Sequence, residues 1–188
     1  MTTRRDFLKT MTMASAGLAL GAGDILANPT FASQRKITDK VKIAYVGIGN
    51  RGEQIIGDFA RTGMVEVVAL CDVDMGAPHT QKVMNLYPKA KRFRDFRQMF
   101  DKAGNEFDAV AIATPDHSHF PISMLALASG KHVYVEKPLA RTFYEGELLM
   151  QAALKRPNLV TQVGNQGHSE ANYFQFKAWM DAGISAYE

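Results

Sequence analysis

The chain has 188 residues, of which 46% are hydrophobic and 22% are charged, and its formal net charge is +3. This composition is typical of a globular protein, and the length suits one domain or one and a half. A charge excess this small gives no reason to expect nucleic acid or an anionic membrane as a partner. The single cysteine, Cys71, excludes an intramolecular disulfide framework.

Residues 1–32 are predicted to be an export signal rather than part of the fold. Arg4 and Arg5 are followed by Phe-Leu-Lys, which resembles the twin-arginine consensus, and residues 10–23 are uncharged. That stretch is shorter than the roughly 20 apolar residues of a membrane span. Two small-residue sites compete for cleavage, Ile25-Leu26-Ala27 and Thr30-Phe31-Ala32. We therefore expect the twin-arginine translocation machinery as a partner, a periplasmic location and a linker over residues 33–40; the alternative is a disordered basic N-terminus.

The first folded elements have the layout of a dinucleotide-binding unit. An apolar strand is expected over residues 41–46, and it ends in Gly47–Gly52, which reads G-x-G-x-x-G. An amphipathic helix is expected over residues 51–61 and a second apolar strand over residues 65–71. Asp72 follows that strand, about 20 residues after the last glycine, as the nucleotide-binding fingerprint requires. A plain strand-to-helix turn is the alternative, but the flanking strands and the acid favour dinucleotide binding.

Each residue of the turn has a physical reason to be there. Gly47 permits the tight bend, Gly49 lets the backbone approach a pyrophosphate, and Gly52 lets the helix pack against the sheet. Asn50 and Arg51 lie at the start of the helix, where free N–H groups and the helix dipole attract phosphate. All five residues are therefore predicted to bind the cofactor.

Asp72 also bears on which dinucleotide is bound. Its carboxylate can accept hydrogen bonds from the adenosine ribose hydroxyls, an interaction worth roughly 1.5–3 kcal/mol. A 2′-phosphate would instead meet like-charge repulsion, and residue 73 is a valine rather than a basic side chain. The sequence therefore predicts NAD rather than NADP.

Strand and helix patterns continue to alternate along the rest of the chain. Helices are expected at 77–86, 95–103, 120–129 and 142–156, and strands at 91–93, 109–113, 132–135 and 159–163. Such alternation predicts an α/β fold, a Rossmann doubly wound parallel sheet covered on both faces. Ligands of such sheets bind beyond the carboxyl ends of the strands. Three polar segments follow strands there: Thr114 to His119, Glu136 to Pro138, and Gly164 to His168.

Three motifs together carry a resemblance to a known family. The segments G-I-G-N-R-G, A-T-P-D-H-S-H and V-E-K-P-L-A, in this order and spacing, resemble the glucose–fructose oxidoreductase/inositol dehydrogenase (Gfo/Idh/MocA) family. The resemblance implies an NAD(P)-binding Rossmann domain, here residues 41–163, followed by an α/β substrate domain. It implies a sugar or polyol as substrate. It also implies a set of residues around the nicotinamide: Thr114, Pro115 and His119 on its side, Glu136 and Lys137 beside it, and Asn165 and Gln166 opening onto the same cleft.

Residues 164–188 are expected to be only the start of the substrate domain. Family members run well beyond this length and supply an Asp-x-x-x-His element from that domain, which does not appear after Gln166. We therefore expect a truncated chain that binds nucleotide without turning over substrate. A homo-oligomer is left open for the full-length form.

Lys137 is the candidate proton-transfer group. An ordinary lysine has a pKa near 10.4, so a basic lysine at neutral pH requires burial or a nearby cation. Glu136 would oppose that shift, and we expect it to orient Lys137 or the cofactor amide. A surface lysine is the alternative. His117 and His119 with Asp116 have unremarkable spacing for a metal site, and no metal is predicted.

Three functions remain from sequence alone. The leading one is an NAD-dependent oxidoreductase that acts on a secondary hydroxyl of a sugar or polyol. The others are an NAD-dependent glycosidase of the same superfamily, against which Lys137 counts, and a nucleotide-binding module without activity.

Overall fold

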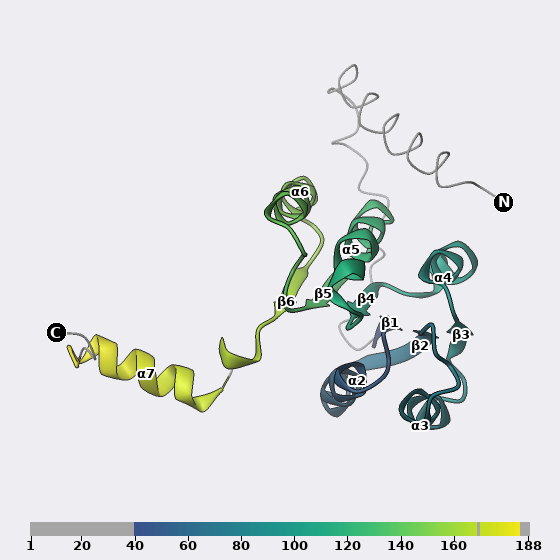
Figure 1. The fold of residues 1–188 in the computed structure, drawn as a ribbon, viewed down its shortest axis with the longest axis horizontal. Coiled ribbons are helices and arrows are strands. Elements are labelled where there is room, and N and C mark those ends of the chain that lie inside the picture. Colours follow the sequence, from purple (N-terminus) through teal and green to yellow (C-terminus); the bar gives the residue numbers. More distant parts are fainter. Residues whose placement is uncertain (1–39, 169, 185–188) are drawn as a thin grey trace, which may run out of the picture. The chain divides into compact units, whose positions relative to one another are not determined.

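The computed structural model describes residues 40–168 and 170–184. Their centre is a six-stranded parallel sheet with the strand order β3-β2-β1-β4-β5-β6 (Figure 1). This is the 3-2-1-4-5-6 order of a Rossmann fold, in which the order reverses between β1 and β4. The predicted fold class is therefore confirmed.

The elements lie close to their predicted positions. The strands are β1 (Val41–Val46), β2 (Val65–Cys71), β3 (Lys91–Phe93), β4 (Ala109–Ile112), β5 (His132–Glu136) and β6 (Thr161–Gly164). The α-helices are α2 (Arg51–Arg61), α3 (Pro78–Leu86), α4 (Phe96–Ala103), α5 (His119–Ala128), α6 (Phe143–Leu154) and α7 (Ala171–Asp181). Short 3₁₀ turns are η2 (Gly104–Glu106), η3 (Asp116–Ser118) and η4 (Gln166–His168).

The last strand of the sheet differs most from its prediction, which placed it at residues 159–163. The N–H of Leu159 donates to Arg156 O at 2.9 Å, and that of Val160 donates to His132 Nδ1 at 2.9 Å. Both N–H groups therefore form hydrogen bonds outside the pattern of the parallel sheet, and β6 begins at Thr161. At its other end it continues to Gly164, which lies opposite Glu136 of β5.

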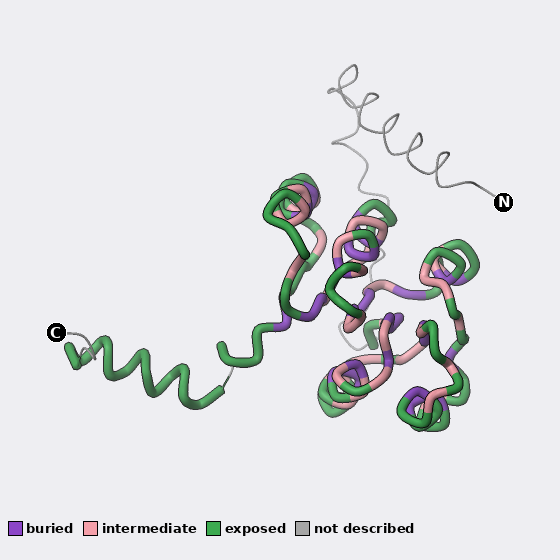
Figure 2. The backbone as a smooth tube through the Cα atoms, in the orientation of Figure 1, coloured by how far each residue is buried: buried purple, intermediate pink, exposed green. Residues whose placement is uncertain are grey.

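Alternate strand residues face two separate cores, as a sheet covered on both faces requires. Ala44 and Val46 join the core formed with α4, α5 and α6, whereas Ile43 and Tyr45 join the core formed with α2 and α3. The purple segments of Figure 2 follow the strands and the inner sides of these helices. Both cores therefore hold the carboxyl ends of the strands in a fixed arrangement.

Local signals mark several element boundaries. Asp95 caps α4 by accepting from Arg97 N, and Thr142 and Glu145 form the predicted capping box of α6. Gly130 has a φ of 70° after α5, which is the predicted left-handed end of that helix.

The predicted signal peptide, residues 1–32, lies outside the described residues, as does the linker up to residue 39. In the described part of the chain, no helix has the length and apolar character needed to cross a membrane.

Candidate nucleotide-binding site

The glycine turn between β1 and α2 is packed too closely for side chains. A Cβ on Gly47 would lie 2.6 Å from the carbonyl group of Ala113 and 2.8 Å from Thr114 N, and its φ is 79°. A Cβ on Gly52 would collide with Gly47 O. The turn is therefore pressed against the end of β4, at the point where the strand order reverses and nucleotides bind.

The start of α2 presents the groups that a pyrophosphate requires. Asn50 is the N-cap, with a φ of 45°, and its side chain makes no capping hydrogen bond. Close by, Thr114 Oγ1 is buried without a hydrogen-bond partner among the described residues. An uncapped helix N-terminus beside a glycine-rich turn and an unpartnered hydroxyl fits a phosphate ligand with hydroxyl groups. The residues present therefore fit the diphosphate of NAD.

Asp72 lies beside this turn, as predicted. Its Oδ2 accepts from Ile48 N at 2.9 Å and its Oδ1 accepts from Asp74 N at 3.0 Å. Each carboxylate oxygen has a further lone pair available for a ribose hydroxyl. Asp72 thus fixes the turn and keeps a negative charge where the adenosine ribose is expected.

Arg51 points its side chain across the sheet to β5. Its Nη2 donates to Glu136 Oε1 at 3.0 Å, and Tyr134 Oη donates to the same oxygen at 3.0 Å. Glu136 is only 5% exposed, and Arg51 supplies the opposite charge that a buried carboxylate needs. Burial is the main cause that raises the pKa of Tyr134 to about 12, and the hydrogen bond to Glu136 raises it further.

This arrangement changes the role expected for Glu136. The sequence suggested that its carboxylate orients Lys137 or the cofactor amide, but its hydrogen bonds are to Arg51 and Tyr134. Successive strand residues point to opposite faces, so Glu136 and Tyr134 share the α2 face. Lys137 follows directly after β5 and is exposed.

His119 lies buried beneath the two loop segments that follow β4 and β5. It is 1% exposed, and its Nδ1 and Nε2 lie 2.6 Å from Pro138 O and 2.8 Å from Thr114 O. The imidazole thereby joins the segment after β4 to the segment after β5. Sequence reasoning expected it to line the nicotinamide side, and the structure places it behind Thr114; Pro115 is exposed at this edge.

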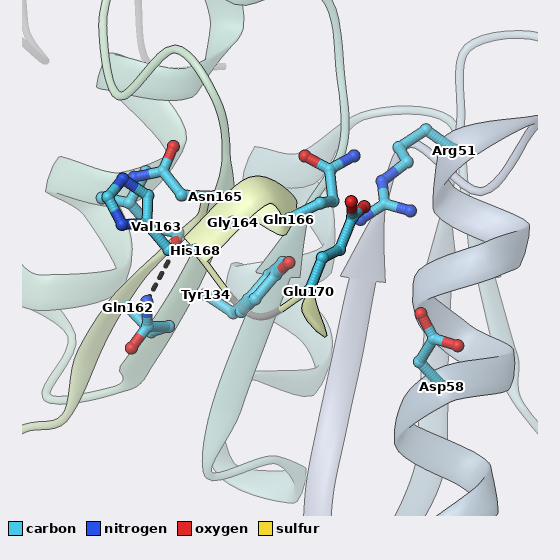
Figure 3. A pocket seen from close by; sticks show the side chains of 10 residues that line it. All are labelled: Arg51, Asp58, Tyr134, Gln162, Val163, Gly164, Asn165, Gln166, His168 and Glu170. Carbon is cyan, nitrogen blue, oxygen red and sulfur yellow. Dashed lines mark hydrogen bonds between the residues drawn. The ribbon is translucent and has the colours of Figure 1, made fainter. Parts of the chain in front are cut away.

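Asn165 and Gln166 line a cavity of about 640 Å³ on the α2 side of the sheet. Arg51 lines the same cavity from α2, and Figure 3 shows the side chains of these three residues around it. Arg51, from the start of α2, and the two residues predicted after β6 are thus brought to one cavity, whereas the glycines of the turn and Asn50 do not line it.

Two residues of this region were missed by the sequence reasoning, Tyr134 and Gly164. A Cβ on Gly164 would lie 2.5 Å from Tyr134 Oη and 2.9 Å from Glu136 Cδ. The available signal was the position of Tyr134 two residues before Glu136 in the same strand, because residues i and i+2 share a face. The need for glycine at position 164 depends on strand register.

The fold order, the glycine turn and Asp72 together define a dinucleotide-binding Rossmann domain. Residues 41–164 match the model of the Gfo/Idh/MocA family, described as an oxidoreductase family with an NAD-binding Rossmann fold. The chain therefore belongs to this family, and NAD is its cofactor.

Two relatives of the chain are enzymes of different types. The chain is 30% identical over 145 residues to inositol 2-dehydrogenase of Salmonella paratyphi B, covering 76% of this chain and 42% of the relative. It is 29% identical over 161 residues to an alpha-N-acetylgalactosaminidase of Shewanella oneidensis, covering 76% of this chain and 35% of the relative.

A solved structure supports the same family. Scyllo-inositol dehydrogenase of Lactobacillus casei, crystallised with NAD(H) and scyllo-inositol, superposes with a TM-score of 0.67 at 27% identity. The match covers 77% of this chain and 42% of that one. The chain thus spans less than half the length of these relatives.

Proposed function

We propose that the protein is an NAD-dependent oxidoreductase that transfers hydride between the nicotinamide and a secondary hydroxyl of a sugar or polyol. The main observation in support is the position of Lys137, directly after β5 at the carboxyl edge of the sheet. That edge also carries the glycine turn and Thr114, so a substrate beside the nicotinamide would lie within reach of this amine.

The charge arrangement supports this role for Lys137. Glu136 shares its carboxylate oxygen between Arg51 and Tyr134, so the sequence neighbour of Lys137 is already paired. Lys137 is therefore not committed to an ion pair with Glu136 and can act on a substrate hydroxyl.

NAD, when bound, supplies the hydride acceptor. In the oxidising direction, Lys137 Nζ would take the proton of the substrate hydroxyl as the carbon that carries it is oxidised. A carbonyl product and a protonated amine remain, and the reverse direction returns the same proton.

A substrate panel tests this activity. The full-length protein is incubated with NAD and inositols, aldoses or alditols, and NADH formation is followed by its absorbance. Reduction with at least one polyol or sugar, lost when Lys137 is replaced, is the expected result. Absence of NADH formation with every inositol, aldose and alditol would overturn it.

The second candidate function is an NAD-dependent glycosidase, and it is favoured by the similarity to the Shewanella oneidensis galactosaminidase. Such an enzyme would oxidise the sugar transiently, so glycoside cleavage would occur without net NADH formation. Product analysis with a glycoside library separates the two proposals.

We further propose export by the twin-arginine pathway and a periplasmic location. Arg4 and Arg5, followed by Phe-Leu-Lys and an uncharged stretch, support this proposal. The pathway carries folded proteins, so NAD would travel inside the protein and remain bound during successive oxidation and reduction steps.

A further inference from the structure

The imidazole of His79 lies against the second glycine of the turn. The three atoms nearest to a Cβ built on Gly49 would all belong to the His79 ring, with Nε2 at 2.7 Å and Cγ at 3.4 Å. The backbone of Gly49 is not in the left-handed region, so its conformation alone does not require glycine. The space beside Gly49 is thus occupied by a histidine ring.

The segment between β2 and α3 holds His79 in this place. Asp74 Oδ1 accepts from Gly76 N and from Ala77 N, both at 3.1 Å, and Asp74 O accepts from the buried Thr80 hydroxyl at 2.7 Å. These bonds fix the first turn of α3, on which His79 is exposed. The same segment begins with Asp72, whose carboxylate binds Ile48 N. Two side chains from one segment therefore flank adjacent residues of the glycine turn.

We propose that His79 contacts the bound nucleotide, with a ring N–H donating to an oxygen of the diphosphate. The second glycine of such a turn is where the backbone comes closest to the pyrophosphate. A ring in contact with that glycine is therefore within reach of the phosphate oxygens. A hydrogen bond to an anionic oxygen is also about twice as strong as a neutral one. The proposal rests on NAD binding alone, and it holds whichever substrate the protein uses.

Calorimetry on the full chain tests this contact. His79→Ala is compared with wild type and with Asn85→Ala, which alters an exposed side chain farther along the same helix. The titrants are NAD, ADP and adenosine. In His79→Ala the Kd values for NAD and ADP should rise by about tenfold, the loss expected for one hydrogen bond to a charged group. The Kd for adenosine should not change, and Asn85→Ala should match wild type for all three.

Each other outcome overturns the assignment. Unchanged or tighter binding of NAD by His79→Ala would mean that the ring makes no contact or obstructs the nucleotide. An equal loss for adenosine and ADP would place the ring against the nucleoside instead of the phosphates. Thermal denaturation of each variant, with melting temperatures close to wild type, shows that the measured differences arise at the site. Substrate turnover is not needed for any of these measurements, so a failed substrate panel leaves this test intact.

Discussion

The guanidinium of Arg51 and the carboxylate of Glu136 form an ion pair of 3.0 Å between residues that are 85 positions apart. The pair connects the glycine turn, where we expect the cofactor to bind, to β5, the strand that directly precedes Lys137. The hydrogen bond to Glu136 is also the main cause that raises the pKa of Arg51. The ion pair thereby links the start of α2 to the end of β5, the residue directly before the proposed catalytic lysine.

Arg51→Ala should lower the free energy of unfolding by about 1–3 kcal/mol, because it leaves a buried carboxylate without its counter-charge. The estimate lies below that for a fully buried pair, since the Arg51 side chain is 32% exposed. Denaturant unfolding measures the loss. Arg61→Ala is the matched control on the same helix: its pair with Asp58 is exposed, and its effect should stay below about 1 kcal/mol. Equal losses for the two variants would contradict the role of the Arg51–Glu136 pair.

Gly164→Ala should displace Glu136 and Tyr134, because the added methyl group would collide with both side chains. We expect a loss of about 1–3 kcal/mol in unfolding free energy, the usual cost of overpacking. Gly167→Ala is the control, since a Cβ there meets nothing within 4 Å. A crystal structure of Gly164→Ala that retains the 3.0 Å Arg51–Glu136 contact would show that the prediction is wrong.

Wild-type protein should bind NAD at least about tenfold more tightly than NADP, because Asp72 would repel a 2′-phosphate. Asp72→Asn should reduce this preference, since the amide oxygen can still accept from Ile48 N while the negative charge is gone. Calorimetry with both nucleotides measures the four dissociation constants. Equal affinities in the wild type would remove Asp72 as the specificity residue.

Lys137→Ala should lower turnover of the full-length enzyme by on the order of 10²–10⁴, the range for general acid–base catalysis. The Kd for NAD should hardly change, because the glycine turn and Asp72 hold the diphosphate and ribose. In steady-state kinetics across a pH series, the pH dependence of turnover that arises from proton transfer should also disappear. Lys89→Ala, an exposed lysine that precedes β3 at the opposite edge of the sheet, is the control. A raised KM with unchanged turnover would instead make Lys137 a residue that positions substrate.

Replacing Arg4 and Arg5 with lysine should retain a fused reporter in the cytoplasm. The paired arginines are read by the translocation machinery, and lysine keeps the charge while changing the planar head group. Cell fractionation measures the distribution of the reporter. A periplasmic reporter in the double variant would contradict the signal prediction.

The local sequence determined the elements and the class of ligand. Alternating apolar residues, the capping box of Thr142 and Glu145, and the spacing from Gly47 to Asp72 each act over a few residues or within one βαβ unit. Short-range sterics and hydrogen bonds decide such features, so a pattern of residue types is sufficient to predict them.

Only the tertiary structure decided where the polar side chains of the site point. Glu136 accepts hydrogen bonds from Arg51 and Tyr134, and His119 is buried between two carbonyl groups. Gly164 is required because strand register places it opposite Glu136. These outcomes depend on burial and on which strands become neighbours. A buried charge takes the partner that packing brings to it, and that partner can lie far away in the sequence.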